Sequence, residues 1–314
     1  MTNQITILSS LLLLQLIIAS MLFSTDSHVD SAMTTTSLVD IKDNAVDEIQ
    51  IIANNDELTL TKHDGRWQLK NHPELPLIQS KVSALTNDLV KSKVTWPVTK
   101  TSSSHERFKV ANDHFAKKII FSKNGTKGDE KDSEKYAEQH TVLLGDSPNF
   151  KKLYARNEAD DNVYSISYSI HQASTDADAW LDKSLLSVDS ISQIKHSVIN
   201  LKKQDDKWQL ASPDDKTEQT ALDTDSIEEL VNQLTRFTVK GIADTSYEPS
   251  NQLVVHDEAN NEYIYSFAAK DNNYFVKRND INQWFSLAKP KFEQLANLSM
   301  DNFISTNKNY VEEG

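Results

Sequence analysis

The sequence predicts an α+β protein in which an N-terminal transmembrane helix precedes two related modules of antiparallel β-hairpins and amphipathic helices. Three observations carry this prediction. They are an apolar N-terminal segment, a hairpin pattern that occurs twice, and a helical pattern after each copy of the hairpin. The chain has 314 residues, which is enough for two domains of ordinary size.

The apolar segment is Ile5–Phe23, and its 19 residues at about 1.5 Å per residue just span a hydrocarbon core of about 30 Å. A cleavable secretory signal is the alternative, but Met1–Gln4 carries no Lys or Arg, and no clear Ala-x-Ala cleavage site follows. We therefore predict an uncleaved transmembrane anchor over residues 1–24 and a polar tether over residues 25–37. The predicted protein crosses the inner membrane once and has its globular part in the periplasm.

The repeated hairpin covers Leu58–Leu69 in its first copy and Ile199–Leu210 in its second. In each copy two alternating runs flank a polar turn, and Trp-Gln-Leu lies in the second run. Such period-2 alternation around Asp or Gly predicts a β-hairpin. Trp67 and Trp208 match between the copies. A ligand-stacking role is possible for them, but a Trp at matched positions in two repeats is more often part of the core.

Each hairpin is followed by a proline-containing break and an amphipathic helix. Apolar residues recur there at helical spacing, namely Val82, Leu85, Leu89 and Val90 in the first copy and Ile227, Leu230, Val231 and Leu234 in the second. Further strands are predicted at Lys117–Ser122, Thr141–Leu144, Tyr154–Arg156, Val163–Ser167, Leu253–His256, Tyr263–Ala268, Tyr274–Lys277 and Trp284–Leu287. Helices over Ile170–Leu181 and Lys291–Leu298 close the two modules, which span residues 38–186 and 187–305 before a tail at 306–314.

The spacing of residues also matches late in the two modules. Tyr154 and Val163 are as far apart as Phe275 and Trp284, which places Arg156 and Lys277 at nearly equivalent strand positions. These two cations could face an acidic ligand, but a solvated strand face is the commoner reason for such residues.

The overall charge limits the partners. The chain carries 46 acidic and 33 basic residues, a formal net charge of -13. Nucleic acids and anionic lipid headgroups both require Lys/Arg patches, so we expect no nucleic-acid binding. The chain also has no cysteine, which excludes disulfides, thiolate metal sites and a cysteine nucleophile.

No local motif predicts a reaction. The six glycines form no phosphate loop, dinucleotide fingerprint or nucleophile elbow, and the nine histidines include no pair at zinc-site spacing. Asp176, Asp178 and Asp182 could bind a cation or act as acid and base, but an acidic helix start is the commoner reason for such a group. Asp223 and Asp225 mark a second helix start. We therefore predict a protein that is not an enzyme, with no catalytic residue, metal or cofactor.

One order of motifs resembles a known family. Two Trp-x-Leu units surround Val142–Gly145, Tyr154–Arg156, Val163–Tyr164 and Trp180–Leu186. This order, over roughly residues 40–245, is similar to the bacterial domain of unknown function 4340 family. Val110 and His114 depart from the family pattern, as does the charged insertion at 123–139. The family has no assigned catalytic residues.

The resemblance implies a function, because members are typically membrane-anchored and their genes commonly neighbour an ABC transporter of the gliding-motility type. We therefore expect a non-catalytic, membrane-anchored extracytoplasmic accessory subunit of an ABC-type transport system, which acts as a scaffold or presents substrate. The implied partners are the permease, the ATPase and an extracytoplasmic protein. The alternatives are a periplasmic binding module for an envelope polymer or solute and, less favoured, a hydrolase. A pocket lined by aromatics would favour the binding module, and an exposed apolar patch would favour the subunit.

Overall fold

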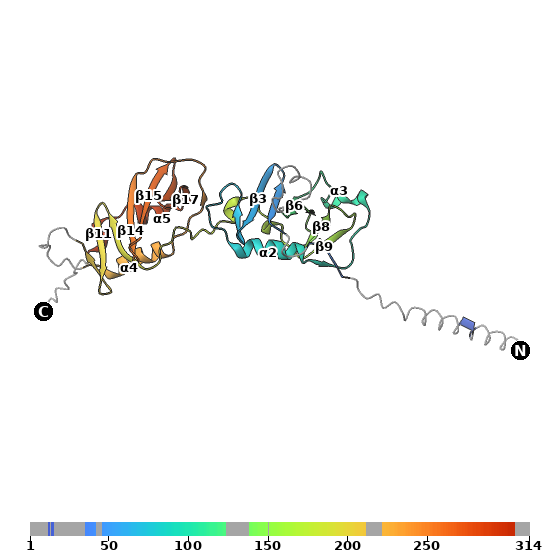
Figure 1. Ribbon diagram of the computed structural model, residues 1–314, viewed down its shortest axis with the longest axis horizontal. Helices are drawn as coiled ribbons and strands as arrows, with labels where there is room; N and C mark the ends of the chain where they lie inside the picture. Colours follow the sequence, from blue (N-terminus) through green and yellow to red (C-terminus); the bar gives the residue numbers. More distant parts are fainter. Residues whose placement is uncertain are drawn as a thin grey trace, which may run out of the picture. The chain divides into compact units, whose positions relative to one another are not determined.

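The structure is a computed structural model that describes residues 12, 14–15, 35–41, 46–123, 138–149, 151–211 and 222–304 (Figure 1). The described residues form mostly β-sheet, arranged in three antiparallel sheets. Two of these sheets are large. The third joins only β1 (Thr36–Ser37) to β5 (Lys93–Val94).

The first large sheet has seven strands in the order β4-β3-β2-β6-β7-β8-β9. Their bounds are β2 Glu48–Ala53, β3 Asp56–His63, β4 Arg66–Leu69, β6 Lys117–Ser122, β7 Gln139–Leu144, β8 Leu153–Asn157 and β9 Val163–Ile166. Alternation of side chains explains the burial, since Ile49 and Ile51 in β2 and Leu58 and Leu60 in β3 are buried while their neighbours are more exposed.

The second large sheet has eight strands in the order β12-β11-β10-β14-β15-β16-β17-β13. Their bounds are β10 Ile191–His196, β11 Ile199–Gln204, β12 Lys207–Leu210, β13 Gly241–Ile242, β14 Asn251–Asp257, β15 Glu262–Lys270, β16 Asn273–Arg278 and β17 Phe285–Leu287. Apart from β13, this order repeats that of the first sheet strand for strand. We call Glu48–Ile166 the first half and Ile191–Leu287 the second half.

The pairing register is also duplicated. Matching cross-strand pairs are Lys62–Trp67 with Lys203–Trp208, Leu60–Leu69 with Leu201–Leu210, and Tyr154–Ser165 with Phe275–Ser286. A slip of one residue would move every side chain of a strand to the opposite face, so equal registers preserve the same buried set. The predicted hairpins and the match of Tyr154 to Phe275 are therefore confirmed.

Each half contributes one helix of 12 residues, α2 (Gln79–Val90) and α4 (Thr224–Thr235). Both bury the predicted apolar stripe on one face, except that Val231 in α4 is half-buried. Asp223 caps the first residues of α4, because its carboxylate accepts from the amides of Asp225 and Ser226. The remaining α-helices of the described chain are short, namely α3 (His105–Phe108) and α5 (Lys289–Ala296).

The predicted α+β class was wrong, because strands dominate the described residues. The helix expected over Ile170–Leu181 contributed to this error. That segment contains only two short 3-10 turns, η3 (Ile170–Gln172) and η4 (Ala177–Ala179). Ser174 accepts a hydrogen bond from the amide of Asp176, and Asp176 accepts from that of Asp178. Such local side-chain bonds compete with a continuous helix.

The prediction of a transmembrane helix over residues 1–24, and of a single-pass inner-membrane location that depended on it, is also corrected. Within the described ranges, no helix combines the length and the apolar character that crossing a membrane requires. Of Ile5–Phe23, all but residues 12, 14 and 15 lie outside the described residues, as do residues 124–137 of the predicted insertion and the tail from 305 onward.

Candidate functional site

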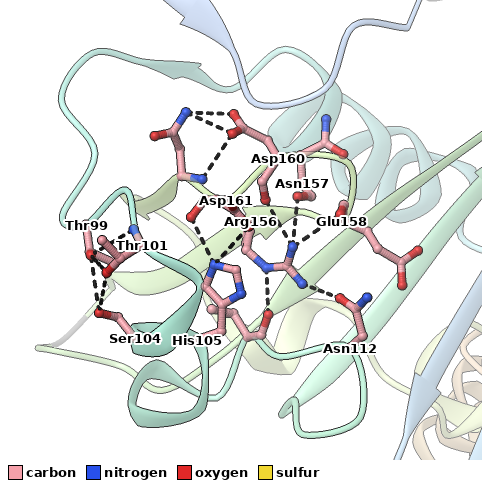
Figure 2. Close-up of polar contacts among 12 residues, drawn as sticks. Thr99, Thr101, Ser104, His105, Asn112, Arg156, Asn157, Glu158, Asp160 and Asp161 are labelled. Atoms are coloured by element: carbon pink, nitrogen blue, oxygen red, sulfur yellow. Dashed lines mark hydrogen bonds and ion pairs between the residues drawn. The ribbon is translucent and has the colours of Figure 1, made fainter.

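Polar side chains of the first half gather around the buried Arg156, near the end of β8 (Figure 2). Arg156 is only 3% exposed, although arginine is almost never fully buried unless it is paired. A buried guanidinium has five N–H donors, each of which needs an acceptor. The acceptors around Arg156 therefore decide what this cluster can do.

Those acceptors are neutral oxygens of the surrounding loops. They are the carbonyls of Val110 (2.7 Å from Nε), Asp160 (3.0 Å from Nη1) and Glu158 (3.2 Å from Nη1), and the side-chain amide oxygen of Asn112, which accepts from Nη2. The first loop follows α3 and the second connects β8 to β9. Arg156 thus ties two loops to the same strand, and these bonds occupy four of its five donors.

Nearby carboxylates balance the buried charge. Burial lowers the pKa of Arg156, while the negative charges of Glu158, Asp161 and Asp160 oppose that shift, so the guanidinium stays charged. A hydrogen bond from Lys118 (2.9 Å) is the main cause that lowers the pKa of the Glu158 carboxyl. The cluster therefore combines a charged guanidinium at Arg156 with an ionised carboxylate at Glu158.

His105 lies beside Arg156 and is also buried. Its Nε2 lies 2.9 Å from the carbonyl oxygen of Asp161, and because a carbonyl can only accept, Nε2 must carry the proton. The hydroxyls of Thr99, Thr101 and Ser104 hydrogen-bond to one another nearby. These contacts fix the loops at the end of the sheet, and the arrangement supports a structural role for the cluster.

Lys277 occupies the position in β16 that Arg156 occupies in β8, as the sequence spacing predicted. Its environment differs, since Lys277 is half-buried and its ammonium donates to the side-chain oxygen of Asn282 at 2.7 Å. It borders a pocket of about 300 Å³ that is also lined by Asp244, Ser246 and Gln283. That volume is at the lower limit for small-molecule sites.

Arg278, the next residue, is the buried arginine of the second half, with 6% of its surface exposed. It donates to both carboxylate oxygens of Asp280, at 2.6 and 2.9 Å, and to the carbonyls of Ser187 and Leu185. Because successive strand residues point to opposite faces, Arg278 lies on the face opposite to Lys277. The two buried arginines are therefore not equivalent.

The three predicted carboxylates bind separate backbone amides. Asp176 accepts from Asp178, and Asp182 accepts from Ser184. Asp178 accepts from the amide of Ile242 at 2.7 Å, and burial is the main cause that raises its pKa. They form no shared acid–base pair. Within the described ranges, no three His, Asp or Glu residues gather where they could hold a metal ion.

Four of the five tryptophans serve packing. Trp67, Trp180 and Trp284 are buried, Trp208 is half-buried, and the indole N–H of Trp180 donates to the carbonyl of Ser174 at 2.9 Å. These positions support core packing rather than ligand stacking.

The fifth tryptophan, Trp96, is 72% exposed, and Val98 beside it is 47% exposed. Both belong to the edge segment, which we define as residues 93–100. This segment runs beside β9: the amide of Val98 donates to the carbonyl of Val163 at 2.7 Å, and Thr99 forms a bridge with the same residue. The exposed apolar side chains are thus presented from a backbone that is held in place.

The comparison with protein families gives one result. A family model described as Domain of unknown function (DUF4340) matches residues 67–254. The chain belongs to this family. No curated protein and no solved structure matches it.

The matched range of this DUF4340 protein includes Trp96 and Arg156 but ends before Lys277 and Arg278. Sequence reasoning missed Trp96. The signal that could have found it is a mismatch between the repeats. The amide of Val98 donates to Val163, and the amide of Ala243 donates to Trp284. If Val98 corresponds to Ala243, then Trp96 corresponds to Gly241. The first half therefore has an exposed indole at a position where the second half has no side chain.

Proposed function

We propose that this DUF4340 protein is a non-catalytic accessory subunit of an ABC-type transport system, which acts as a scaffold or presents substrate through contacts with partner proteins. The observation that carries this proposal is the exposure of Trp96 together with Val98 on the edge segment. Exposed apolar groups that cluster on a surface mark sites of protein contact.

The energetics of association favour such a site. Tryptophan is enriched among the few interface residues that supply most of the binding energy, because its large surface is desolvated on contact. A side chain on an ordered backbone also loses less conformational freedom when it binds. Two backbone hydrogen bonds supply that order here, because the Val98 amide donates to the Val163 carbonyl and the Val163 amide donates to the Thr99 carbonyl.

A second candidate function is a binding module for an envelope polymer or solute. The pocket beside Lys277 favours it, because Asp244, Ser246, Asn282 and Gln283 supply polar groups suited to a hydrophilic ligand. The pocket lacks an exposed aromatic platform, since Trp284 beside it is 6% exposed. We therefore rank this function below the first.

The test is to co-express the full chain with the permease, the ATPase and the extracytoplasmic protein that the proposal implies as partners, and to purify the complex through a tag on the permease. We expect the chain to copurify in a fixed ratio. The Trp96→Ala variant should be retained at least about tenfold less, the loss expected for a hot-spot residue worth more than about 1.4 kcal/mol.

Val198→Ala is the matched control, because Val198 is 46% exposed in the second half, and it should copurify like the wild type. Recovery no higher than with an unrelated tagged membrane protein would contradict the proposed function. Equal loss in both variants would show that exposed apolar residues matter only through general adhesion.

A further inference from the structure

The edge segment of the first half is basic as well as apolar. No Asp or Glu occurs between Asp88 and Glu106, and this stretch carries Lys91, Lys93 and Lys100, in a chain whose net charge is -13. Lys93 and Lys100 are exposed in the same segment as Trp96, and the ammonium of Lys93 also donates to the Ser37 hydroxyl at 3.0 Å. A positive strip with an exposed indole on an otherwise acidic protein attracts negatively charged partners.

The second half shows what covers the equivalent positions there. Gly241, Ile242 and Ala243 are buried or half-buried, and Asp178 contacts Gly241 and Ile242. A Cβ atom added at Gly241 would come within 1.8 Å of the Asp178 carboxylate, and the Ile242 amide donates to the same group. The covering segment also carries Asp176 and Asp182, so an acidic segment meets this edge.

The first half differs at each of these positions. Trp96 stands for Gly241, Pro97 for Ile242 and Val98 for Ala243. Proline has no N–H, so Pro97 offers no donor to an incoming strand and disfavours strand addition at this position. The start of the segment, Lys93–Val94, is already paired with β1. A partner must therefore contact this edge through side chains rather than by extending the sheet.

We infer that the edge segment docks an acidic segment of a partner protein, with Trp96 seated in an apolar recess of that partner and with Asp or Glu side chains near Lys93 and Lys100. The assignment of the partner to a transport system rests on the proposed function. The chemistry of the contact rests on the edge segment and on the acidic cover of its counterpart. Desolvation of the indole holds the complex together, while the charges speed its formation and make it depend on salt.

The test uses the full chain in living cells, with Trp96→p-benzoylphenylalanine as a photocrosslinker and Val198→p-benzoylphenylalanine as the control position. Ultraviolet light should produce a discrete adduct from position 96 that the control lacks. Mass spectrometry of the adduct should place the crosslink in a segment where Asp and Glu outnumber Lys and Arg.

The partner protein that the crosslink identifies is then purified on its own. Its affinity for the wild type, for Trp96→Ala and for the double variant Lys93→Glu/Lys100→Glu is measured at two salt concentrations. Trp96→Ala should weaken binding at least about tenfold at both concentrations. The charge-reversed variant should weaken binding at low salt, and most of that loss should disappear at high salt, because exposed charges are screened.

The outcomes separate the two proposals. No adduct above the control, a crosslink in a segment without excess acid, or a charge-reversed variant that binds like the wild type would each overturn the acidic docking site. An adduct to an acidic segment of a protein unrelated to transport would support the docking site while contradicting the proposed function. A transport complex that forms without contact at Trp96 would support the proposed function while contradicting the docking site.

Discussion

Arg156 and Lys277 hold the same position in two sheets of the same order and register, yet only Arg156 is buried. The pairs Tyr154–Ser165 and Phe275–Ser286 fix this equivalence two residues away. The difference must therefore come from outside the strands, in the connections that cover them.

The connections differ in length. In the first half, residues 101–116 follow the edge segment and include α3, and the loop after α3 brings the Val110 carbonyl and Asn112 to the guanidinium. In the second half, residues 244–250 make the equivalent link to β14 and contain no helix. Lys277 consequently meets Asn282 and an open pocket. The two sheets thus share the same strand order and register. The connections determine whether the cation at this position is buried in a hydrogen-bond network, like Arg156, or borders a pocket, like Lys277.

Among the variants that test this comparison, we expect the largest loss of stability from a substitution at Arg156. Arg156→Met should destabilise the protein by about 3–5 kcal/mol, because loss of the guanidinium leaves the buried Val110 carbonyl and several partly buried acceptors without a donor. Lys277→Met should cost less than about 1 kcal/mol, because this half-buried side chain keeps its ammonium at the surface, where it donates to Asn282. Denaturant unfolding of both variants gives the two free energies of unfolding.

Arg278→Met supplies a control for buried arginines in general, because its guanidinium also meets two carbonyls and the carboxylate of Asp280. It should destabilise the protein about as much as Arg156→Met. Similar small losses for Arg156→Met and Lys277→Met would show that the loops do not depend on Arg156, and would return it to the list of ligand-binding candidates.

A second comparison concerns the matched tryptophans. Trp67→Ala should cost roughly 3–5 kcal/mol, as for buried aromatics generally. The backbone of Trp67 is also fixed by the side chain of Gln79, whose amide oxygen accepts from the Trp67 amide at 2.8 Å. Trp208 is only half-buried, so we expect its replacement by Ala to cost about half as much. Equal losses at the two positions in denaturant unfolding would show that the halves pack alike.

These contrasts separate what the sequence could predict from what it could not. Both hairpins, with Trp67 and Trp208 in matching register, follow from alternation and turn residues, which are local signals. The helix predicted over Ile170–Leu181 failed because Ser174 and Asp176 bind nearby amides instead. Local apolar spacing does not reveal that competition.

The candidate site was even harder to predict from the sequence. The burial of Arg156 depends on Val110 and Asn112, which are more than 40 residues away in sequence. No pattern around Arg156 itself encodes that contact. Trp96 lacked a pattern as well, because a single exposed apolar residue has no period. Only its alignment with Gly241 distinguishes it, and that alignment needs the backbone hydrogen bonds from Val98 to Val163 and from Ala243 to Trp284.

The smallest expected effect concerns Glu158 and its counterpart Asn279. Their amides make equivalent bonds, from Glu158 to the Thr141 carbonyl and from Asn279 to the Ile264 carbonyl. Their side chains differ, since Glu158 accepts from Lys118 whereas Asn279 is neutral and accepts from the Ile264 amide. Only the first half should therefore show a pH dependence at this position.

The sign follows from the lowered pKa of Glu158. Its ionised form is favoured by folding, so its stabilisation is fully present above the ordinary glutamate value of about 4.3 and is lost as the pH falls through the lowered value. Glu158→Gln should cost less than about 1 kcal/mol at pH 7, because solvent screens this partly exposed pair, and almost nothing at the acid end. Asn279→Ala should show the same loss at both pH values. Urea unfolding at several pH values measures these differences, and a Glu158→Gln loss that stays constant down to the acid end would mean that packing, and not the charge on Glu158, stabilises the loop.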